Sequence, residues 1–401
     1  MDLNLTESQL ILRNAARDFL TAEFPSSLAR EMEGDPKGYP VELWQRIVEM
    51  GWLGIVVPQE YGGHDGGFLD LLVLLQEMGR AALPGPFFSI VVLSALPILE
   101  GGSRDQKRAL LPRLCSGELL MSLALSEPGV DFGMDHLVTT AVERNGQHWI
   151  TGTKVFVPDA HVADLLVCIA SGSGSGKVDE GVSAFLVKTA NPGVSVTPLQ
   201  TNLRDRQFEV VFTDVCVERY DALGNVGGAR AWMERALEKA MVAKCAEMVG
   251  AGQKLLQMTV DYAKVRVQFD KPIGALQAIQ HHCANLATCI ETAELMTYRA
   301  GWMIEQGLPC RREALQAKSW ANEACKRAAA LGHQVHGGIG FTREYDLYFY
   351  SGRMAAGARF MGGTDWCYDQ IADEIGLVDR DQQLSSAVRS NEPSRGVRIE
   401  P

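Results

Sequence analysis

The chain has 401 residues, of which 46% are hydrophobic and 22% are charged, and its formal net charge is -11 at pH 7. This balance is typical of a globular protein with two or three domains, and the acidic total argues against nucleic acid as a partner. No run of about 20 apolar residues occurs, so we expect no membrane span, and the acidic, polar N-terminal residues do not resemble a signal peptide.

The cysteines and histidines do not form a metal-binding pattern. Nine cysteines are scattered without a CxxC pair, and Cys245 and Cys325 stand among alanines, which is typical of small buried residues in a reducing compartment. His333 and His336 are spaced to share a helix face, but no cluster of carboxylates or cysteines completes a ligand set. We therefore expect no metal site and a cytoplasmic protein.

Residues 1–119 predict a helical N-terminal domain. Capping-box patterns begin at Thr6 and at Ser103, each with a glutamine three residues later. Between them, apolar residues recur at helical spacing over 41–51 and 68–79, and both runs end in glycine, as helices often do. These features predict several amphipathic helices packed on a common core.

The pattern changes over residues 120–228 to short runs rich in Val, Ile, Phe and Thr. Turn-forming residues at 145–146 and 191–193 and an SGSGSG run at 171–176 separate these runs. No helical pattern follows the SGSGSG run, so we interpret it as a solvated connection and not as a phosphate-binding loop. The segment predicts an antiparallel sheet, either a small barrel or a sandwich.

Residues 229–380 return to helical spacing in long segments, the first of which spans about 50 Å at 1.5 Å per residue. Long helices with short connections predict an antiparallel bundle, and residues 381–401 predict a flexible polar tail. The expected fold class is α+β, mainly α: a helical N-terminal domain, a middle antiparallel β-barrel or sandwich, and a C-terminal antiparallel helical bundle. We expect a ligand cleft where the three domains meet. The predicted helices cover about 231–267, 276–307, 311–335, 344–360 and 365–375.

Three motifs resemble the acyl-CoA dehydrogenase flavoproteins. They are RVQFDKPIGALQAIQHHCANLA at 266–287, QVHGGIGFTREYDLYFYSGRM at 334–354 and the shorter LALSEPG at 123–129. The similarity covers nearly the whole chain, from VPQEYGG in the first domain to MGGT near the end. The resemblance implies FAD as cofactor, an acyl-CoA thioester as substrate, α,β-desaturation as reaction, an electron-transfer flavoprotein as electron acceptor, and an oligomer.

One group of residues, which we call the distal group, suits the phosphate and adenine half of FAD. Arg266 supplies a cation for the pyrophosphate, and Gly337 and Gly338 allow close approach of the backbone. Gln334 offers a hydrogen bond and Phe269 an apolar surface. In the family, the corresponding residues reach the FAD of the neighbouring subunit, and all of them are present here.

A second group, the ring group, corresponds to residues that hold the chain's own flavin ring in the family. Ser126, Phe156 and Thr364 occupy three of these positions. Pro158 replaces a threonine and has neither a hydroxyl nor an N–H to offer the flavin. Residues 130–132, Val-Asp-Phe, add bulk and a negative charge where the family has small residues. The ring group is therefore only partly retained.

The catalytic base of the family is absent from both of its usual positions. Gly362 replaces the glutamate of a Tyr-Glu-Gly-Thr turn, and Ala240 occupies the alternative position on the first long helix of the bundle. Met241 replaces an arginine that faces the substrate in the family. Asp365 and Asp131 are candidates for a replacement base, although each is also explained as a helix-cap or loop acid.

These departures leave three hypotheses open. The chain is an FAD-dependent acyl-CoA dehydrogenase with a replacement base, without which about 10²–10⁴-fold in rate is lost. Or it is the base-lacking subunit of a heteromeric dehydrogenase and completes the FAD site of a second acyl-CoA dehydrogenase-like subunit. Or it is a homo-oligomeric lyase, or another non-oxidative enzyme, on the same scaffold. The second hypothesis explains most directly why the distal group is complete and the ring group is not.

Overall fold

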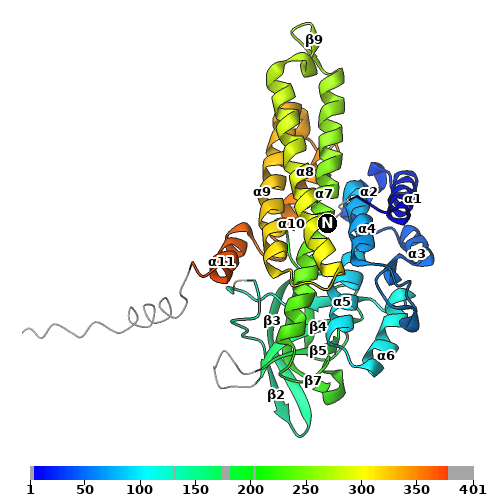
Figure 1. Cartoon of the computed structure of the whole chain (residues 1–401). Coiled ribbons are helices and arrows are strands. Elements are labelled where there is room, and N and C mark those ends of the chain that lie inside the picture. Colours follow the sequence, from blue (N-terminus) through cyan, green and yellow to red (C-terminus); the bar gives the residue numbers. More distant parts are fainter. Residues whose placement is uncertain (1–3, 131, 173–180, 202–204, 378–401) are drawn as a thin grey trace, which may run out of the picture.

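The computed structural model describes residues 4–130, 132–172, 181–201 and 205–377. Figure 1 shows a long helical bundle, a group of shorter helices along one side of it, and a sheet at one end. Asp131, the SGSGSG loop from residue 173 on, and the predicted tail lie outside the described residues. Among the described residues, no helix is both long and apolar enough to cross a membrane.

The N-terminal part is helical, as predicted. Both predicted capping boxes are present, since the Gln9 N–H donates to Thr6 Oγ1 at 3.3 Å and the Gln106 N–H donates to Ser103 Oγ at 3.2 Å. A π-helical segment, η3, was not predicted, and such segments often mark functional sites. The elements are α1 (Glu7–Glu23), α2 (Ser26–Gly34), α3 (Val41–Glu49), η1 (Trp52–Gly54), η2 (Gln59–Tyr61), α4 (Phe68–Ala81), η3 (Phe88–Ala95), α5 (Leu96–Gly101) and α6 (Arg104–Cys115).

The middle part is a seven-stranded sheet in the order β1-β4-β2-β3-β7-β6, with β5 paired to β4. Most neighbouring pairs are antiparallel, but β4 runs parallel to both β1 and β2, so the sheet is mixed and the prediction of a purely antiparallel sheet was wrong in this respect. In the chain, the β2–β3 hairpin lies between β1 and β4. After this hairpin, β4 pairs with β1 and runs in the same direction. The strands are β1 (Met121–Ala124), β2 (Thr140–Arg144), β3 (Gln147–Pro158), β4 (Leu165–Gly172), β5 (Val182–Lys188), β6 (Val194–Pro198) and β7 (Gln207–Glu218).

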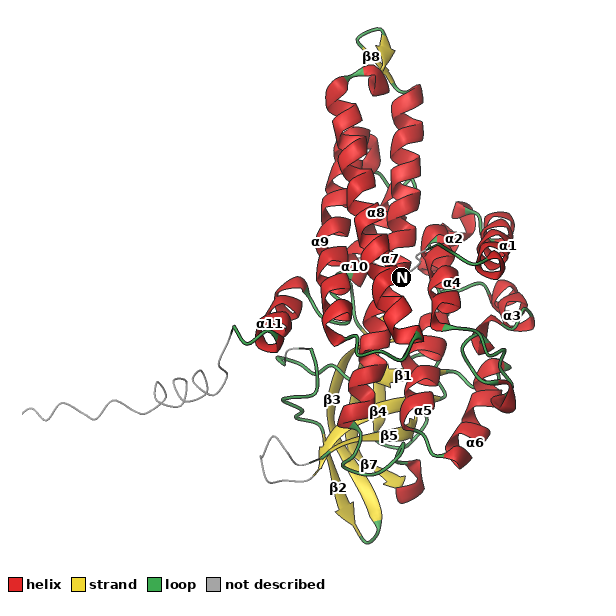
Figure 2. Cartoon of the chain, in the orientation of Figure 1, coloured by secondary structure: helices red, strands yellow, loops and turns green. Residues whose placement is uncertain are grey.

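The C-terminal part is an antiparallel helical bundle, as predicted (Figure 2). A short β8–β9 hairpin joins α7 to α8 at the end of the bundle farthest from the sheet (Figures 1 and 2). The elements are η4 (Arg219–Asp221), α7 (Arg230–Val265), β8 (Val267–Gln268), β9 (Lys271–Pro272), η5 (Ile273–Ala275), α8 (Gln277–Glu305), α9 (Arg311–His336), η6 (Gly337–Phe341), α10 (Leu347–Gly357) and α11 (Thr364–Glu374). The boundaries predicted near 119 and 228 lie just before β1 and just before α7, and as domain boundaries they stay predictions.

Two glycines allow the N-terminal helices to dock closely on the bundle. A Cβ at Gly250 of α7 would lie 1.8 Å from the carbonyl oxygen of Gln76, and a Cβ at Gly79 of α4 would lie 2.0 Å from that of Glu247. Because backbone atoms cannot yield at such distances, α4 and α7 can cross this closely only with glycine at both positions. This crossing fixes the relative position of the walls of the cleft described below.

Candidate functional site

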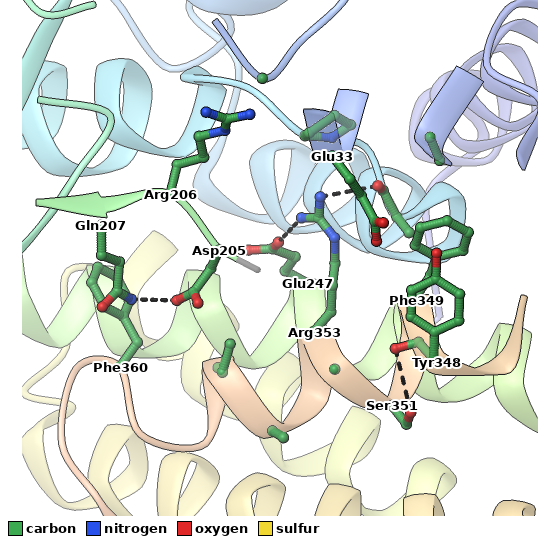
Figure 3. A pocket seen from close by; sticks show the side chains of 18 of the residues that line it. Glu33, Asp205, Arg206, Gln207, Glu247, Tyr348, Phe349, Ser351, Arg353 and Phe360 are labelled. Atoms are coloured by element: carbon green, nitrogen blue, oxygen red, sulfur yellow. Dashed lines mark hydrogen bonds and ion pairs between the residues drawn. The ribbon is translucent and has the colours of Figure 1, made fainter. Parts of the chain in front are cut away.

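A cleft of about 590 Å³ lies where the three parts of the chain meet (Figure 3), and its size is typical of a small-ligand site. Its walls come from α2 and the α4–η3 segment, from the end of β3 and the residues before β7, and from α7, α9 and α10. Pro158 and Phe360 line it, each two residues from a predicted site position, Phe156 and Gly362. The predicted cleft is therefore present, and Pro158, which occupies a ring-group position, forms part of its wall. None of the residues expected to bind FAD or to replace the base lines it.

Phe156 of the ring group sits in a bulge near the end of β3. The register of β3 against β7 shifts between Lys154 and Val157, and Phe156 has a positive φ of 56°. Its side chain is 53% exposed. Bulges re-aim side chains near functional sites, and positive φ at a bulky residue stores strain that the surrounding structure must hold. An exposed aromatic in this conformation is suited to packing against a flat ring.

Ser126 lies beside this bulge, because the Val155 N–H donates to its carbonyl oxygen at 2.9 Å. The flanking residues are tied to β3 by a buried lysine. Lys154 Nζ lies 2.6 Å from Glu127 Oε1 and 3.0 Å from the carbonyl oxygen of Leu125, and the side chains of Lys154 and Glu127 are 0% and 2% exposed. The structure thus brings Ser126 and Phe156 together and holds them through a buried ion pair.

Glu127 is kept ionised by its surroundings. Burial alone would raise its pKa, but attraction to Lys154 and the hydrogen bonds that the carboxylate accepts outweigh burial, so the pKa lies below its ordinary value. The backbone N–H groups of Val138 and Thr139 both donate to this carboxylate. The pair therefore connects the Ser126 segment, β3 and the residues that lead into β2.

The turn that contains Gly362 has no space for a larger side chain at that position. Gly362 has a φ of +97°, and a Cβ there would lie 2.5 Å from Cε3 of the Trp366 ring. Trp366 also packs edge-to-face against Phe132, with ring centroids 5.0 Å apart. The space into which a side chain at position 362 would extend is therefore occupied by a tryptophan ring.

Side chains of helix α9 anchor the Gly362 turn by hydrogen bonds. The buried Lys318 Nζ donates to Asn322 Oδ1 at 2.6 Å and to the carbonyl oxygens of Gly357 and Gly362, each at 3.0 Å. Burial lowers the pKa of Lys318 to about 8. Thr364 of the ring group donates from its hydroxyl to Glu323 Oε1 of α9 at 3.0 Å. The Gly362 turn is thus anchored at its backbone and at the start of α11.

Ala240 and Asp365, two of the positions considered for a base, do not line the cleft. Ala240 is buried in the hydrophobic core with 1% exposure, and Asp365 is exposed in the first turn of α11. Glu238, the nearest acid to Ala240 on α7, faces Arg311, with 3.7 Å between its Oε1 and Arg311 Nη1. A catalytic role for Asp365 stays a prediction, and Asp131 lies outside the described residues.

The distal group gathers at the hairpin end of the bundle. Arg266 caps α7 and follows Tyr262 by one turn, and the Tyr262 ring stacks on His336, with centroids 4.6 Å apart, at the end of α9. Gln334, Gly337 and Gly338 flank His336 and are exposed, and Phe269 is 83% exposed. A cation, bare backbone and an exposed aromatic therefore lie on one surface, which fits the phosphate and adenine half of a dinucleotide.

The distal and ring groups of one chain are separated along the bundle. Glu323, which contacts Thr364, lies eleven residues before Gln334 on α9, or about 16 Å along the helix axis. Ser126 and Phe156 belong to the sheet domain, at the opposite end of the bundle from the β8–β9 hairpin beside Arg266 (Figure 1). The arrangement fits two half-sites that serve different FAD molecules.

The sequence prediction overlooked the charged groups that line the cleft, among them the four described next. Lys244 and Glu247 lie one turn apart on α7, and Arg353 projects from α10 (Figure 3). Asp159, with a positive φ of 52°, accepts a hydrogen bond from the Ser89 hydroxyl of η3 at 2.6 Å. The sequence contains a signal for two of these residues, since Lys244 and Glu247 interrupt an otherwise apolar run of α7.

Asp159 makes the stability of the protein depend on pH. Burial raises its pKa above the ordinary value of 3.8, so the folded chain binds this proton more tightly than the unfolded chain. The stabilisation from Asp159 is therefore fully present below about pH 4 and is lost as pH rises through the raised pKa. We expect Asp159→Asn, which can still accept from Ser89, to gain free energy of unfolding relative to wild type as pH rises. Urea unfolding of both proteins from pH 4 to 8 checks this, and a pH-independent difference would contradict it.

Comparison with known proteins agrees with the fold. Models of the acyl-CoA dehydrogenase N-terminal, middle and C-terminal domains match residues 6–118, 122–215 and 226–375. An acyl-CoA dehydrogenase of Bacillus subtilis (strain 168) is 31% identical over 351 residues, covering 86% of this chain and 92% of the relative.

Two solved structures show the same architecture. The ChsE4-ChsE5 complex from Mycobacterium tuberculosis superposes with a TM-score of 0.86 at 25% identity, covering 94% of this chain and 100% of the matched chain. The FAD complex of PigA gives a TM-score of 0.86 at 25% identity with the same coverage. Together with the three domain matches, these similarities show that the chain belongs to the acyl-CoA dehydrogenase family of FAD-dependent flavoproteins.

Proposed function

We propose that this chain is the base-lacking subunit of a heteromeric acyl-CoA dehydrogenase that desaturates an acyl-CoA thioester between its α and β carbons. The observation that carries the proposal is the Trp366 ring packed over Gly362. A carboxylate at position 362 would have to displace that ring and adopt a positive φ. The turn therefore has no room for a base at position 362. In this proposal a glutamate of the second subunit removes the α-proton.

The distal group gives this chain a specific function in such an assembly, namely to bind FAD. FAD, when bound, accepts the hydride from the β carbon of the substrate. The residues of this chain would hold the FAD of the second subunit: Arg266 by pairing with the pyrophosphate, and the backbone at Gly337 and Gly338 by close approach. The exposure of these residues supports the proposal, because in one chain the β8–β9 hairpin beside Arg266 lies at the opposite end of the bundle from the sheet that carries Ser126 and Phe156 (Figure 1).

The similarity to a two-component structure supports the same proposal. The name of the ChsE4-ChsE5 complex specifies two different components, and this chain shares the fold of the chain matched in it. We further propose that the assembly functions in the cytoplasm and passes its electrons to an electron-transfer flavoprotein. The second subunit would be an acyl-CoA dehydrogenase-like chain with an intact Glu-Gly-Thr turn, and a gene beside that of this chain is the first candidate.

The test is co-expression of this chain with that candidate, in wild-type form and as Arg266→Ala. Arg266 is exposed and caps a helix end, so we expect the variant to fold with a stability within about 0.5 kcal/mol of wild type. We expect the pair to form but to retain clearly less FAD after gel filtration, because a charge-assisted contact to the pyrophosphate is lost. Arg104→Ala, at the start of α6 and also exposed, is the matched control. Failure of the two chains to associate, or full FAD retention by R266A, would contradict the proposal.

One observation favours a second candidate, a homo-oligomeric flavoprotein with non-oxidative, lyase-type or otherwise altered acyl-CoA chemistry. Phe156 is exposed in its bulge, and Ser126 is still held beside it by the Lys154–Glu127 pair, so part of the chain's own ring site is preserved. This candidate predicts that the chain purified alone keeps FAD. It also predicts that acyl-CoA added without oxygen leaves the visible absorbance of the flavin unbleached while a product forms.

A further inference from the structure

The cleft contains a group of cations that the family assignment does not explain. Lys244 and Arg353 both contact one carboxylate, that of Glu247: Arg353 Nη1 lies 2.8 Å from Glu247 Oε1, and Lys244 Nζ bonds to Oε2. The second guanidinium nitrogen of Arg353, Nη2, donates to the carbonyl oxygen of Ala82 at 2.9 Å. The side chains of Lys244 and Glu247 are each only 14% exposed. Two cations therefore share the Glu247 carboxylate, and Figure 3 shows Arg353 beside Glu247 at the cleft wall.

Lys244 has the freer of the two cationic groups. Its Nζ lies 3.8 Å from the centroid of the Phe88 ring and 5.2 Å from that of Phe360. Among the described residues, its hydrogen bond to Glu247 is the only one that the ammonium donates. An ammonium has three donors, so the remaining N–H groups lie against aromatic faces at the cleft wall and are available to a ligand.

Asp159 does not pair directly with Lys244. Its Oδ2 accepts from Ser89 and contacts neither cation by hydrogen bond or ion pair among the described residues. Glu33, Lys37, Asp205 and Arg206 also line the cleft, so the contacts of Lys244, and not the total charge of the cleft, point to a ligand. Lys244 shares the Glu247 carboxylate with Arg353. An anionic group on a ligand would pair with the donors of Lys244 that Glu247 does not use.

The cleft that contains Lys244 and Arg353 is close in the chain to residues of the ring group. The cleft is bounded by Pro158, two residues beyond Phe156, and by Phe360, two residues before Gly362. A ligand that enters the cleft therefore lies next to the ring group. The aromatic walls formed by Phe88 and Phe360, whose rings meet edge-to-face at 6.1 Å, suit an apolar segment between the ring group and the anion.

We propose that the cleft binds an acyl-CoA thioester whose acyl chain ends in a carboxylate, and that Lys244 recognises this carboxylate. The inference rests on the proposed acyl-CoA-related function and goes beyond it, because it adds a thioester site in this chain, separate from the site at which the glutamate of the second subunit would act. Arg353 acts as a positioning residue, because it orients the Glu247 carboxylate and so leaves Lys244 turned toward the cleft. The ligand site does not require a base in this chain, since binding alone is proposed.

The test measures binding by titration calorimetry to the full chain, in complex with its second subunit if it purifies as such. The probes are matched pairs of thioesters that differ only at the end of the chain: adipoyl-CoA against hexanoyl-CoA, and glutaryl-CoA against pentanoyl-CoA. We expect wild type to bind the dicarboxylic member of at least one pair about tenfold or more tightly, which corresponds to about 1.4 kcal/mol. Lys244→Met should abolish or reverse this preference, and Lys244→Arg should restore it.

Lys239→Met is the matched control, because Lys239 lies on the same helix and pairs with Glu100 outside the cleft. It removes the same charge and should keep the preference of wild type. Equal or weaker binding of both dicarboxylic thioesters by wild type would overturn the inference, as would an unchanged preference in K244M. Tight binding of hexanoyl-CoA without any such preference would overturn the inference but leave the proposed function standing, and binding of no thioester at all, with FAD present, would count against both.

Discussion

Lys154→Met is expected to lower the free energy of unfolding by about 3–5 kcal/mol, because it leaves the carboxylate of Glu127 buried without its counter-charge. The loss should exceed that of an ordinary core substitution, since the lysine also donates to the carbonyl oxygen of Leu125. On the second candidate, in which the chain keeps FAD in its own ring site, the same change should also reduce FAD binding, because Ser126 and Phe156 are positioned through this pair. Urea unfolding and the visible flavin spectrum measure the two effects.

Two further variants separate the buried pair from a general loss of charge. Arg113→Met removes one member of an ion pair whose side chains are 47% and 63% exposed, and it should cost less than about 1 kcal/mol. Adding Glu127→Gln to Lys154→Met replaces the unpaired carboxylate with a neutral amide. Its single carbonyl oxygen can still accept from the N–H group of Val138 or of Thr139, so part of the lost stability should return. A K154M protein as stable as R113M would show that the pair does not hold the sheet and the Ser126 segment together.

The second large effect is expected at Gly362, where Gly362→Glu should destabilise the fold without creating a dehydrogenase. A non-glycine residue at a φ of +97° costs about 1–3 kcal/mol, and its Cβ would meet the Trp366 ring at 2.5 Å. The new carboxylate can reach the cleft only if that ring moves. Thermal unfolding and anaerobic bleaching of the flavin by acyl-CoA are the measurements.

The neighbouring glycine provides the matched control for this prediction. Gly363 has an ordinary backbone conformation, with φ of -71°, and a Cβ there would meet nothing within 4 Å. Gly363→Ala should therefore cost less than about 1 kcal/mol, because alanine caps a helix N-terminus less well than glycine, whereas Gly362→Ala should show most of the strain of G362E. Adding Trp366→Ala to G362E should recover part of the stability. If G362E alone were as stable as wild type and bleached its flavin with acyl-CoA, the base position would not be blocked.

Much of the fold could be predicted because local patterns determine it. The long bundle helices follow from sustained helical spacing, and α8 spans Gln277–Glu305 where the sequence predicted 276–307. The π-helix η3 could not be predicted, because FSIVVLSA is buried almost throughout and has no amphipathic period to distinguish helix types. The parallel pairing of β1 with β4 depends on contacts between residues more than 40 positions apart, which strand patterns do not reveal.

The candidate site could be predicted only in part for a similar reason. The identities of Arg266, Gln334 and the two glycines that follow His336 mark the distal group, and the loss of the base is visible at Gly362. The position of the Trp366 ring depends on the φ of Gly362, which sequence alone does not determine. The charges of Lys244 and Glu247 were visible on α7, but their meeting with Arg353 depends on how α10 packs on α7. The position of the Trp366 ring and the contacts of Glu247 with Lys244 and Arg353 depend on tertiary packing, which residue types alone do not reveal.

The measurement that tests the central claim most directly is the number of FAD molecules per chain, determined from visible absorbance for this protein purified alone and for its complex with the second subunit. The account predicts clearly less than one FAD per chain for the isolated protein and about one FAD per pair after co-expression with an acyl-CoA dehydrogenase-like chain that has an intact Glu-Gly-Thr turn. One FAD per chain in the isolated protein, bleached by acyl-CoA alone, would contradict it.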